Sequence, residues 1–133
     1  MRALLRSAAV AGIAATLVAG AAMTAAWAQG EWKAPADAKG TKNPVKGVGN
    51  AKKNIETNCV TCHGAGGKGD GVAAAALTPK PADWTSAKVK ADPDGVLFCK
   101  MSNGRGPMPP WKHLPEDQRW ALVNYIRSLQ AKK

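Results

Sequence analysis

Cys59-Val60-Thr61-Cys62-His63-Gly64 is the stretch around which the rest of this 133-residue chain is organised. Two cysteines stand three positions apart, and a histidine directly follows the second. On one turn of a helix, residues i and i+3 point to the same side. The pattern therefore predicts two thiols directed together with an imidazole beside them. This spacing is typical of c-type haem attachment, in which each sulfur bonds one vinyl group of the porphyrin and the histidine binds the iron.

Three other kinds of site could use the same residues. A zinc site needs two further ligands at plausible spacing, and only Cys99 and His113 remain, which form no second close pair. A redox dithiol usually opens a helix in a strand–helix–strand context, which is absent here. A structural disulfide across a three-residue step would be strained. The motif therefore favours one covalently bound haem.

The first 28 residues are typical of a secretory signal peptide. Arg2 and Arg6 precede an uncharged run at 7–22, and the small residues of Ala-Trp-Ala at 26–28 stand where a signal peptidase cuts. We predict cleavage before Gln29, export to the periplasm and no stable membrane insertion. The run is mostly alanine and falls short of the ~20 strongly apolar residues of a membrane span. Export agrees with the motif, because bacterial c-type haem is attached outside the cytoplasmic membrane.

The remaining 105 residues are enough for one small domain, and they are basic. Seventeen Lys and Arg residues against nine acidic ones give a formal charge of +8. The lysines are scattered and no aromatic platform lies among them, so we expect no nucleic-acid binding. A basic surface on an exported haem protein favours docking to acidic patches on redox partners. A merely soluble basic surface explains the charge equally well.

Helical and loop patterns alternate along the mature chain, and no stretch shows the alternation of a strand. Residues 29–49 are rich in Lys, Pro, Gly and Ala, so we expect an extended or mobile lead-in. The glycine-rich stretch at 64–71 lacks the phosphate-binding pattern and suits close backbone approach. Helices are expected at about 50–58, at 96–101 and from 115 onwards, with a short turn or helix at 72–77.

The axial position opposite His63 has two candidate ligands. Met108 stands between prolines in Gly-Pro-Met-Pro-Pro, a stretch that cannot be regular helix. A soft thioether on a stiff loop suits iron, and methionine–histidine ligation raises the reduction potential relative to bis-histidine. His113, beside the start of the final helix, is the competing ligand. The other mature methionine, Met101, falls in an apolar helix, where core packing is expected.

The second ring nitrogen of His63 should donate its proton to an oxygen, which fixes the ring. Because prolines hold a carbonyl rigidly, we expect this oxygen within residues 77–81, Leu-Thr-Pro-Lys-Pro. The third cysteine, Cys99, ends the apolar run Val-Leu-Phe-Cys. A buried inert thiol is therefore expected there, with a disulfide-linked dimer as the alternative.

Together these stretches resemble a class I bacterial cytochrome c, one of the small single-haem electron carriers. The likeness is carried by Cys-Val-Thr-Cys-His-Gly, Gly-Lys-Gly-Asp-Gly, Pro-Lys-Pro-Ala-Asp-Trp, Ser-Asn-Gly-Arg-Gly-Pro-Met-Pro-Pro-Trp and the final helix with Tyr125. It spans about residues 50–129. The resemblance implies an all-α cytochrome c fold at 50–133, with three to five helices around one covalent haem c. The N- and C-terminal helices are expected to cross.

The resemblance also implies individual roles. Cys59 and Cys62 bind the haem, His63 and Met108 are its axial ligands, and the carbonyl of Pro81 (or Pro79) accepts the His63 ring proton. Trp84, Arg105 and Trp111 are expected near a propionate. Many family members have a glycine and an aromatic residue where this chain has Ala51 and Ile55. The helix crossing is therefore expected to be less tightly packed.

With both axial positions filled, the iron has no open site for a substrate, so the predicted function is that of an electron carrier and not an enzyme. A periplasmic monomer would pass single electrons through an exposed haem edge to docked dehydrogenases, oxidases or reductases. Two alternatives stay open. The protein could be the dedicated haem subunit of a periplasmic dehydrogenase, or a five-coordinate haem enzyme or gas sensor if Met108 does not bind iron.

Overall fold

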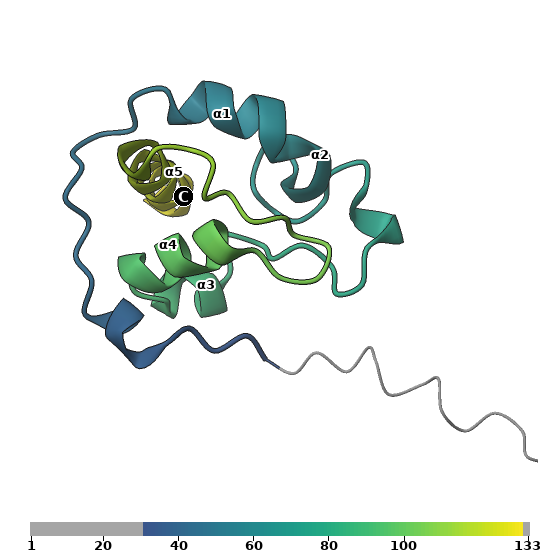
Figure 1. Cartoon of the computed structure of the whole chain (residues 1–133). Helices are drawn as coiled ribbons and strands as arrows, with labels where there is room; N and C mark the ends of the chain where they lie inside the picture. The colour runs from purple at the N-terminus through teal and green to yellow at the C-terminus, as the bar shows by residue number, and fades with distance from the viewer. Residues whose placement is uncertain (1–30, 132–133) are drawn as a thin grey trace, which may run out of the picture. The chain divides into compact units, whose positions relative to one another are not determined.

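The computed structural model describes residues 31–131, so the predicted signal peptide and its cleavage site lie outside the described residues. Within that range the chain forms helices and loops and no strand (Figure 1). The α-helices are α1 (Ala51–Asn58), α2 (Val60–His63), α3 (Ala87–Ala91), α4 (Asp94–Asn103) and α5 (Glu116–Ala131), and the 3-10 helices are η1 (Ala36–Lys39) and η2 (Ala74–Ala76). The all-α prediction is confirmed, and the α-helix number lies within the expected range.

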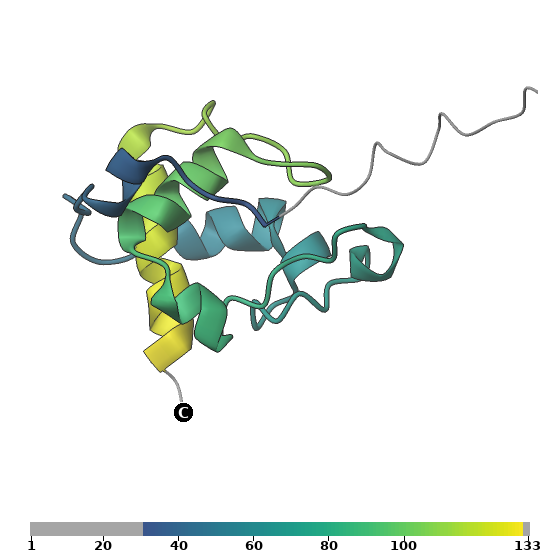
Figure 2. The same cartoon turned by 90° about the horizontal axis from the view of Figure 1, so that it is seen from below.

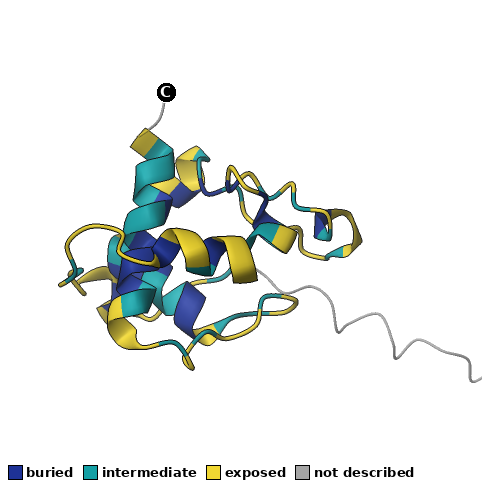
Figure 3. Cartoon of the chain, turned by 90° about the horizontal axis from the view of Figure 1, so that it is seen from above, coloured by how far each residue is buried: buried dark blue, intermediate teal, exposed yellow. Residues whose placement is uncertain are grey.

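The core forms where α1, α4 and α5 meet, and the buried residues gather there (Figure 3). α1 crosses α5 steeply, as Figures 1 and 2 show from two directions. The buried side of α1 consists of Ala51 and Ile55, spaced i and i+4, with exposed fractions of 1% and 2%. The looser crossing expected from these two residues is therefore not observed. Full burial of an isoleucine stabilises the fold by about 1.5–3 kcal/mol.

α4 contributes the second wall of this core. Leu97 and Met101, spaced i and i+4, are buried in it, which confirms the packing role expected for Met101. The neighbouring Phe98 stacks its ring on Trp120 of α5, with centroids 3.9 Å apart. The guanidinium of Arg119 lies over the other side of this pair, 4.7 Å from the Phe98 ring centre. The aromatic stack and its cation fix the relative position of α4 and α5.

The short helix α3 precedes α4 and was not expected from the sequence. Ser86 caps it, because its hydroxyl oxygen accepts the backbone N–H of Val89 at 3.3 Å. Arg127 of α5 then joins the turn between α3 and α4 to the rest of the molecule. Its Nε donates to the carboxylate of Asp94 at 2.8 Å, and its guanidinium also donates to the carbonyl of Asp92. A helix of five residues is too short to show an amphipathic period, which explains why the sequence pattern did not reveal it.

The lead-in, for which composition predicts an extended or mobile segment, lies mostly outside any helix over its described residues 31–49. It contains η1, whose Ala38 is buried, and it runs from beside α4 to the start of α1 (Figure 1). Asn43 and Asn124 hold it to α5: the Asn43 amide donates to the Asn124 side chain at 2.9 Å, and the Asn124 amide donates to the carbonyl of Val45 at 3.0 Å. These anchors are polar and depend on single side chains, so they leave no apolar period in the sequence.

No helix within residues 31–131 has the length and apolar character needed to cross a bilayer. The prediction of no membrane insertion for the mature chain rests on the signal peptide, which lies outside this range.

Candidate functional site

The central motif occupies a single turn at the junction of α1 and α2. Cys59 ends α1, where its N–H donates to the carbonyl of Ile55 at 2.9 Å. Its own carbonyl then accepts the N–H groups of Cys62 at 3.1 Å and His63 at 2.8 Å. One backbone oxygen therefore holds the turn that carries both later members of the motif. The chain places the two thiols and the imidazole on adjacent steps of helix, as the spacing predicted.

Both cysteine side chains of the motif are half-buried free thiols. Burial, with a smaller contribution from the neighbouring Cys62, raises the pKa of Cys59 to about 11. Redox dithiols depend on a lowered thiol pKa, so this environment argues against thiol–disulfide chemistry. Among the described residues, no three His, Cys, Asp or Glu side chains gather in a way that could hold a metal ion. The zinc and disulfide alternatives therefore gain no support from the structure.

The imidazole of His63 is buried, with an exposed fraction of 9%. Nδ1 lies 3.1 Å from the carbonyl oxygen of Ala82, which accepts its proton. Burial lowers the pKa of His63, and the bond to Ala82 opposes part of that shift. The neutral imidazole that results has its free electron pair on Nε2, as a metal ligand requires.

The acceptor for His63 was expected at Pro81 and is one residue later. The oxygen of Pro81 instead packs against Gly69, at the position where a side chain would begin. Gly69 has φ +72°, so a residue with a side chain would be disfavoured there in any case. Because this close contact turns the Pro81 carbonyl toward the glycine loop, the next carbonyl of the segment reaches the imidazole.

The glycine-rich loop folds back onto the haem motif and closes the end of α2. Its backbone N–H groups donate to three carbonyls that the helix leaves open: Gly69 to His63 at 2.9 Å, Gly71 to Cys62 at 3.2 Å, and Ala73 to Thr61 at 3.0 Å. A side chain at Gly71 would collide with the carbonyls of Thr61 and Val60. The backbone of this stretch therefore approaches the chain's own motif closely. Its approach to a porphyrin stays a prediction.

Trp84 lies against His63, a contact that sequence reasoning missed. The two rings are stacked with centroids 4.4 Å apart and an interplanar angle of 23°. The indole is 8% exposed and belongs to the core cluster. A propionate contact for Trp84 stays a prediction, but its observed neighbour is the imidazole. No single-sequence signal distinguishes a tryptophan that covers a histidine from one that lies beside it.

Met108 is carried by a tight turn that leaves α4 and returns to it. The backbones of Arg105 and Met108 pair through two hydrogen bonds of 2.8 and 3.0 Å. The N–H of Trp111 then donates to the carbonyl of Met101 at 3.2 Å, which ties the end of the turn to α4. Met108 and Trp111 are half-buried and pack against the same core as Cys59. The stiff loop expected around Met108 is therefore observed.

The competing ligand, His113, is exposed and lies beside Trp111, with ring centroids 5.2 Å apart. Arg105 is half-exposed, and its backbone bonds to Met108. The roles of Arg105 and Trp111 toward a propionate stay predictions. Cys99 is half-buried and not buried as expected, because it faces the end of α4, where the Asn103 amide donates to its sulfur at 3.2 Å.

The donor set fits a c-type haem. Two free thiols stand on one turn, and among residues 31–131 no group is hydrogen-bonded to Nε2 of His63. Met108 supplies a soft sulfur on a loop that packs on the same core as Cys59. Fixing the imidazole through Nδ1 while leaving Nε2 available is the arrangement expected of a metal-binding histidine.

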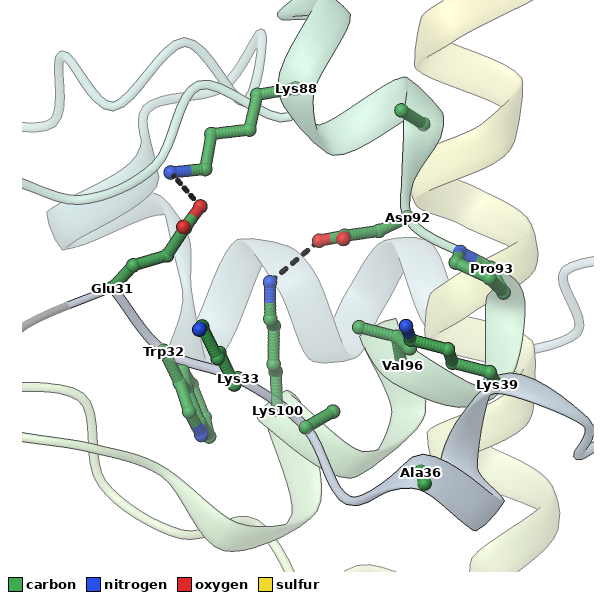
Figure 4. A pocket seen from close by; sticks show the side chains of 12 residues that line it. Glu31, Trp32, Lys33, Ala36, Lys39, Lys88, Asp92, Pro93, Val96 and Lys100 are labelled. Atoms are coloured by element: carbon green, nitrogen blue, oxygen red, sulfur yellow. Dashed lines mark hydrogen bonds and ion pairs between the residues drawn. The ribbon is translucent and has the colours of Figure 1, made fainter.

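A groove of about 790 Å³ lies elsewhere, between the lead-in and the α3–α4 corner (Figure 4). None of the motif residues at 59–63 lines it. Its lining combines Trp32 and several small apolar residues with lysines and two acidic residues. Lys88 pairs with Glu31 at 2.8 Å, and Lys100 pairs with Asp92 at 2.6 Å. The remaining lining lysines are Lys33 and Lys39.

Comparison with known proteins finds a family match over the part of the chain that contains this site. The family model described as Cytochrome c matches residues 48–130, which include the motif and the Met108 loop. The chain is also similar to a chain of the reducing HAO-like protein complex Kustc0457/Kustc0458 of Kuenenia stuttgartiensis, with a TM-score of 0.56 and 25% identity. That match covers 67% of this chain and 45% of the Kuenenia chain, so this chain spans less than half the length of the Kuenenia chain. No curated protein matches the sequence.

Proposed function

The chain belongs to the cytochrome c family, and on this premise we propose that it is an exported one-electron carrier with a single covalent haem c. Membership of the family implies haem-based electron transfer and haem c as the cofactor. The finer proposal concerns the number of haems, the axial ligands and the carrier role. Bound haem supplies an iron that changes between its ferric and ferrous states; the chain supplies attachment, orientation and exclusion of water.

Each of four side chains has one task in this proposal. Cys59 and Cys62, which stand on one turn, would hold the haem through thioether bonds. His63 would bind the iron through Nε2 while its Nδ1 is held by Ala82. Met108, on its pinned loop, would be the second iron ligand. The half-buried setting of both cysteines limits access of water to the bonds.

The observation that carries the proposal is the tight turn that presents Met108. A turn closed by two backbone hydrogen bonds and packed on the core holds the thioether in place at little entropic cost on binding. Such a loop has no role in a five-coordinate site, where the second axial position must stay open. We therefore favour the carrier over an enzyme or gas sensor.

The test is the absorption spectrum of the oxidised protein in the near infrared, where iron–methionine ligation gives a weak charge-transfer band. Met108→Ala should remove the band and allow the reduced protein to bind carbon monoxide at once. Met101→Leu is the matched control, because it changes the other described methionine while conserving core volume. A wild-type protein that lacks the band and binds carbon monoxide promptly would refute the proposal.

Redox partners with acidic docking surfaces are the second part of the proposal. The basic charge of the chain and the lysines of the groove in Figure 4 support it. Electron-transfer rates with the physiological partner should fall steeply as salt rises, because screening shortens the range of charge steering. Reversing Lys33 and Lys39 to Glu tests the groove, and reversing Lys52 and Lys53 of α1 provides a control with the same change in net charge. A salt-independent rate would contradict steering by lysine.

A dedicated haem subunit of an enzyme complex is the second candidate function. The observation that favours it is the similarity to a chain of a two-component HAO-like complex. Size-exclusion chromatography of the protein purified from its source at high salt distinguishes the free carrier from the haem subunit. Elution as a free monomer supports the carrier, and co-elution with a fixed stoichiometry of another chain supports the subunit.

Periplasmic location follows from the predicted signal peptide and from the requirements of haem attachment. Cell fractionation and N-terminal sequencing of the mature protein test it. The expected result is a periplasmic chain that begins at Gln29.

A further inference from the structure

The segment after the proline-rich stretch is built around Trp84, which has no task in the proposed function. Its indole stacks on the His63 ring at 4.4 Å and covers one face of the imidazole. The acceptor of the Nδ1 proton, the carbonyl of Ala82, belongs to an exposed residue. The bond that orients the proposed iron ligand is partly buried, and a buried aromatic ring lies beside the imidazole.

Trp84 is itself fixed from two directions. Its backbone N–H donates to the carbonyl of Gly67 at 2.7 Å, which joins it to the glycine loop. Its carbonyl accepts the side-chain amide of Gln130 at 2.7 Å, which joins it to α5. The indole also packs on Gly67 so closely that a side chain there would collide with its six-membered ring. The glycine loop and the last helix thus determine where the indole lies.

The indole opposes two changes at the imidazole: rotation of the ring and access of water to its bond with Ala82. Rotation of the ring out of its plane is opposed by the indole that lies nearly parallel to it. Access of water to Nδ1 from the covered face is opposed by the burial of Trp84. A partner that holds a ligating histidine in place in this way affects metal binding without touching the metal.

We propose that Trp84, held by Gln130, is a positioning residue that fixes the His63 ring and shields its Nδ1–H bond to Ala82 from water. This inference rests on the proposed function, since it treats His63 as the iron ligand. It assigns Trp84 a role different from the propionate contact expected from the resemblance. A stacking partner needs an aromatic ring, whereas a propionate donor needs the indole N–H.

Trp84→Phe and Trp84→Leu separate these two roles. Phenylalanine keeps a ring for stacking and loses the N–H, and leucine loses both. Trp32→Leu is the control, because Trp32 is a half-buried tryptophan that lines the groove of Figure 4, away from the motif residues at 59–63. All variants are studied as the haem-loaded protein in its reduced state, labelled with nitrogen-15 at histidine and valine.

The measurement is hydrogen exchange of the His63 ring proton, divided by exchange of the Val123 backbone amide. Val123 is fully buried in α5, so its amide reports global opening, and the ratio removes differences in overall stability. We expect Trp84→Leu to raise the ratio of His63 ring-proton exchange to Val123 amide exchange about tenfold. This is the lower end of the effects seen when a residue that positions a metal ligand is mutated. Trp84→Phe and Trp32→Leu should stay near wild type. An unchanged ratio in Trp84→Leu, or a Phe variant that matches the Leu variant, overturns the proposal.

A measurement on the wild type covers the case in which Trp84→Leu does not fold. Magnetisation transfer between the indole ring protons of Trp84 and the ring proton of His63 is expected, and its absence overturns the proposal. Failure of the proposed function would look different. A chain without haem absorbance, or without the iron–methionine band, contradicts the carrier while the contact between Trp84 and His63 is still detected.

Discussion

Replacing Gly104 with alanine is expected to detach the Met108 loop while the rest of the fold remains. Gly104 ends α4 with φ +60°, a conformation that residues with a side chain rarely adopt. A Cβ atom at this position would lie 2.5 Å from the carbonyl oxygen of Met108, from the carbonyl carbon of Pro109 and from the nitrogen of Pro110. All three are backbone atoms, so no side chain can rotate away to make room.

The expected loss of unfolding free energy in Gly104→Ala has two parts, one from backbone conformation and one from contacts with the loop. The backbone conformation of Gly104, with φ +60° and ψ 174°, is essentially restricted to glycine and costs about 1–3 kcal/mol for an alanine. The contacts with the returning loop add about 1–3 kcal/mol, typical of an overpacked site, and moving the loop is the way to relieve them. Gly47→Ala is the matched control, because Gly47 has φ +72° and an added Cβ would meet no atom within 4 Å. Gly47→Ala should therefore lose stability only through its positive φ, whereas the cost of contacts with the loop should appear only in Gly104→Ala.

The assay is urea unfolding of the haem-loaded protein, read together with the near-infrared iron–methionine band. Gly104→Ala should lose about 2–6 kcal/mol of unfolding free energy, the sum of the two parts, and most of the band. Gly47→Ala should lose about 1–2 kcal/mol and keep the band. If Gly104→Ala is no less stable than Gly47→Ala and retains its band, then the loop is not held as described and the argument for a fixed Met108 fails.

Two further predictions concern the frame around the site. In a urea titration, Ile55→Ala should lower the unfolding free energy by about 2–5 kcal/mol, because it leaves a cavity between α1 and α5. Val72→Ala is the control, since the Val72 side chain is 93% exposed. Its unfolding free energy should stay within about 0.5 kcal/mol of wild type. Hydrogen bonds from the Thr85 hydroxyl and N–H hold the pKa of Asp83 below its usual range. The carboxylate therefore contributes stability that is complete above the ordinary aspartate pKa and is lost as pH falls through the lowered native value. Melting temperatures measured from neutral pH downwards should accordingly decline less in Asp83→Asn than in wild type, and parallel curves would contradict this.

The parts of the fold that were predictable from sequence are those with a local or periodic cause. The motif turn follows from the spacing of Cys59 and Cys62, and the last helix follows from its amphipathic pattern. The stiff turn at Met108 follows from the prolines beside it. Each of these depends on neighbours in the chain, so the pattern contains the information.

The features that were not predictable depend on contacts between distant segments. Ala82 and not Pro81 is the acceptor for His63, and the Pro81 carbonyl packs against Gly69 of the returning glycine loop. Trp84 meets the imidazole only after the same loop and α5 have taken their places. The lead-in is anchored by the amides of Asn43 and Asn124, far apart in the sequence.

The two proposed axial ligands are held by different local contacts, and both sets of contacts depend on α5. His63 depends on Trp84, whose carbonyl is bonded to Gln130 near the end of α5. The segment that follows the Met108 loop depends on Arg119 near the start of α5, whose Nε donates to the carbonyl of Leu114 at 3.1 Å. Because both attachments are made to one helix, loosening α5 should disturb both ligands together. A change confined to Gly104 should release the methionine alone, so the pattern of ligand loss distinguishes damage to the helix from damage to the loop.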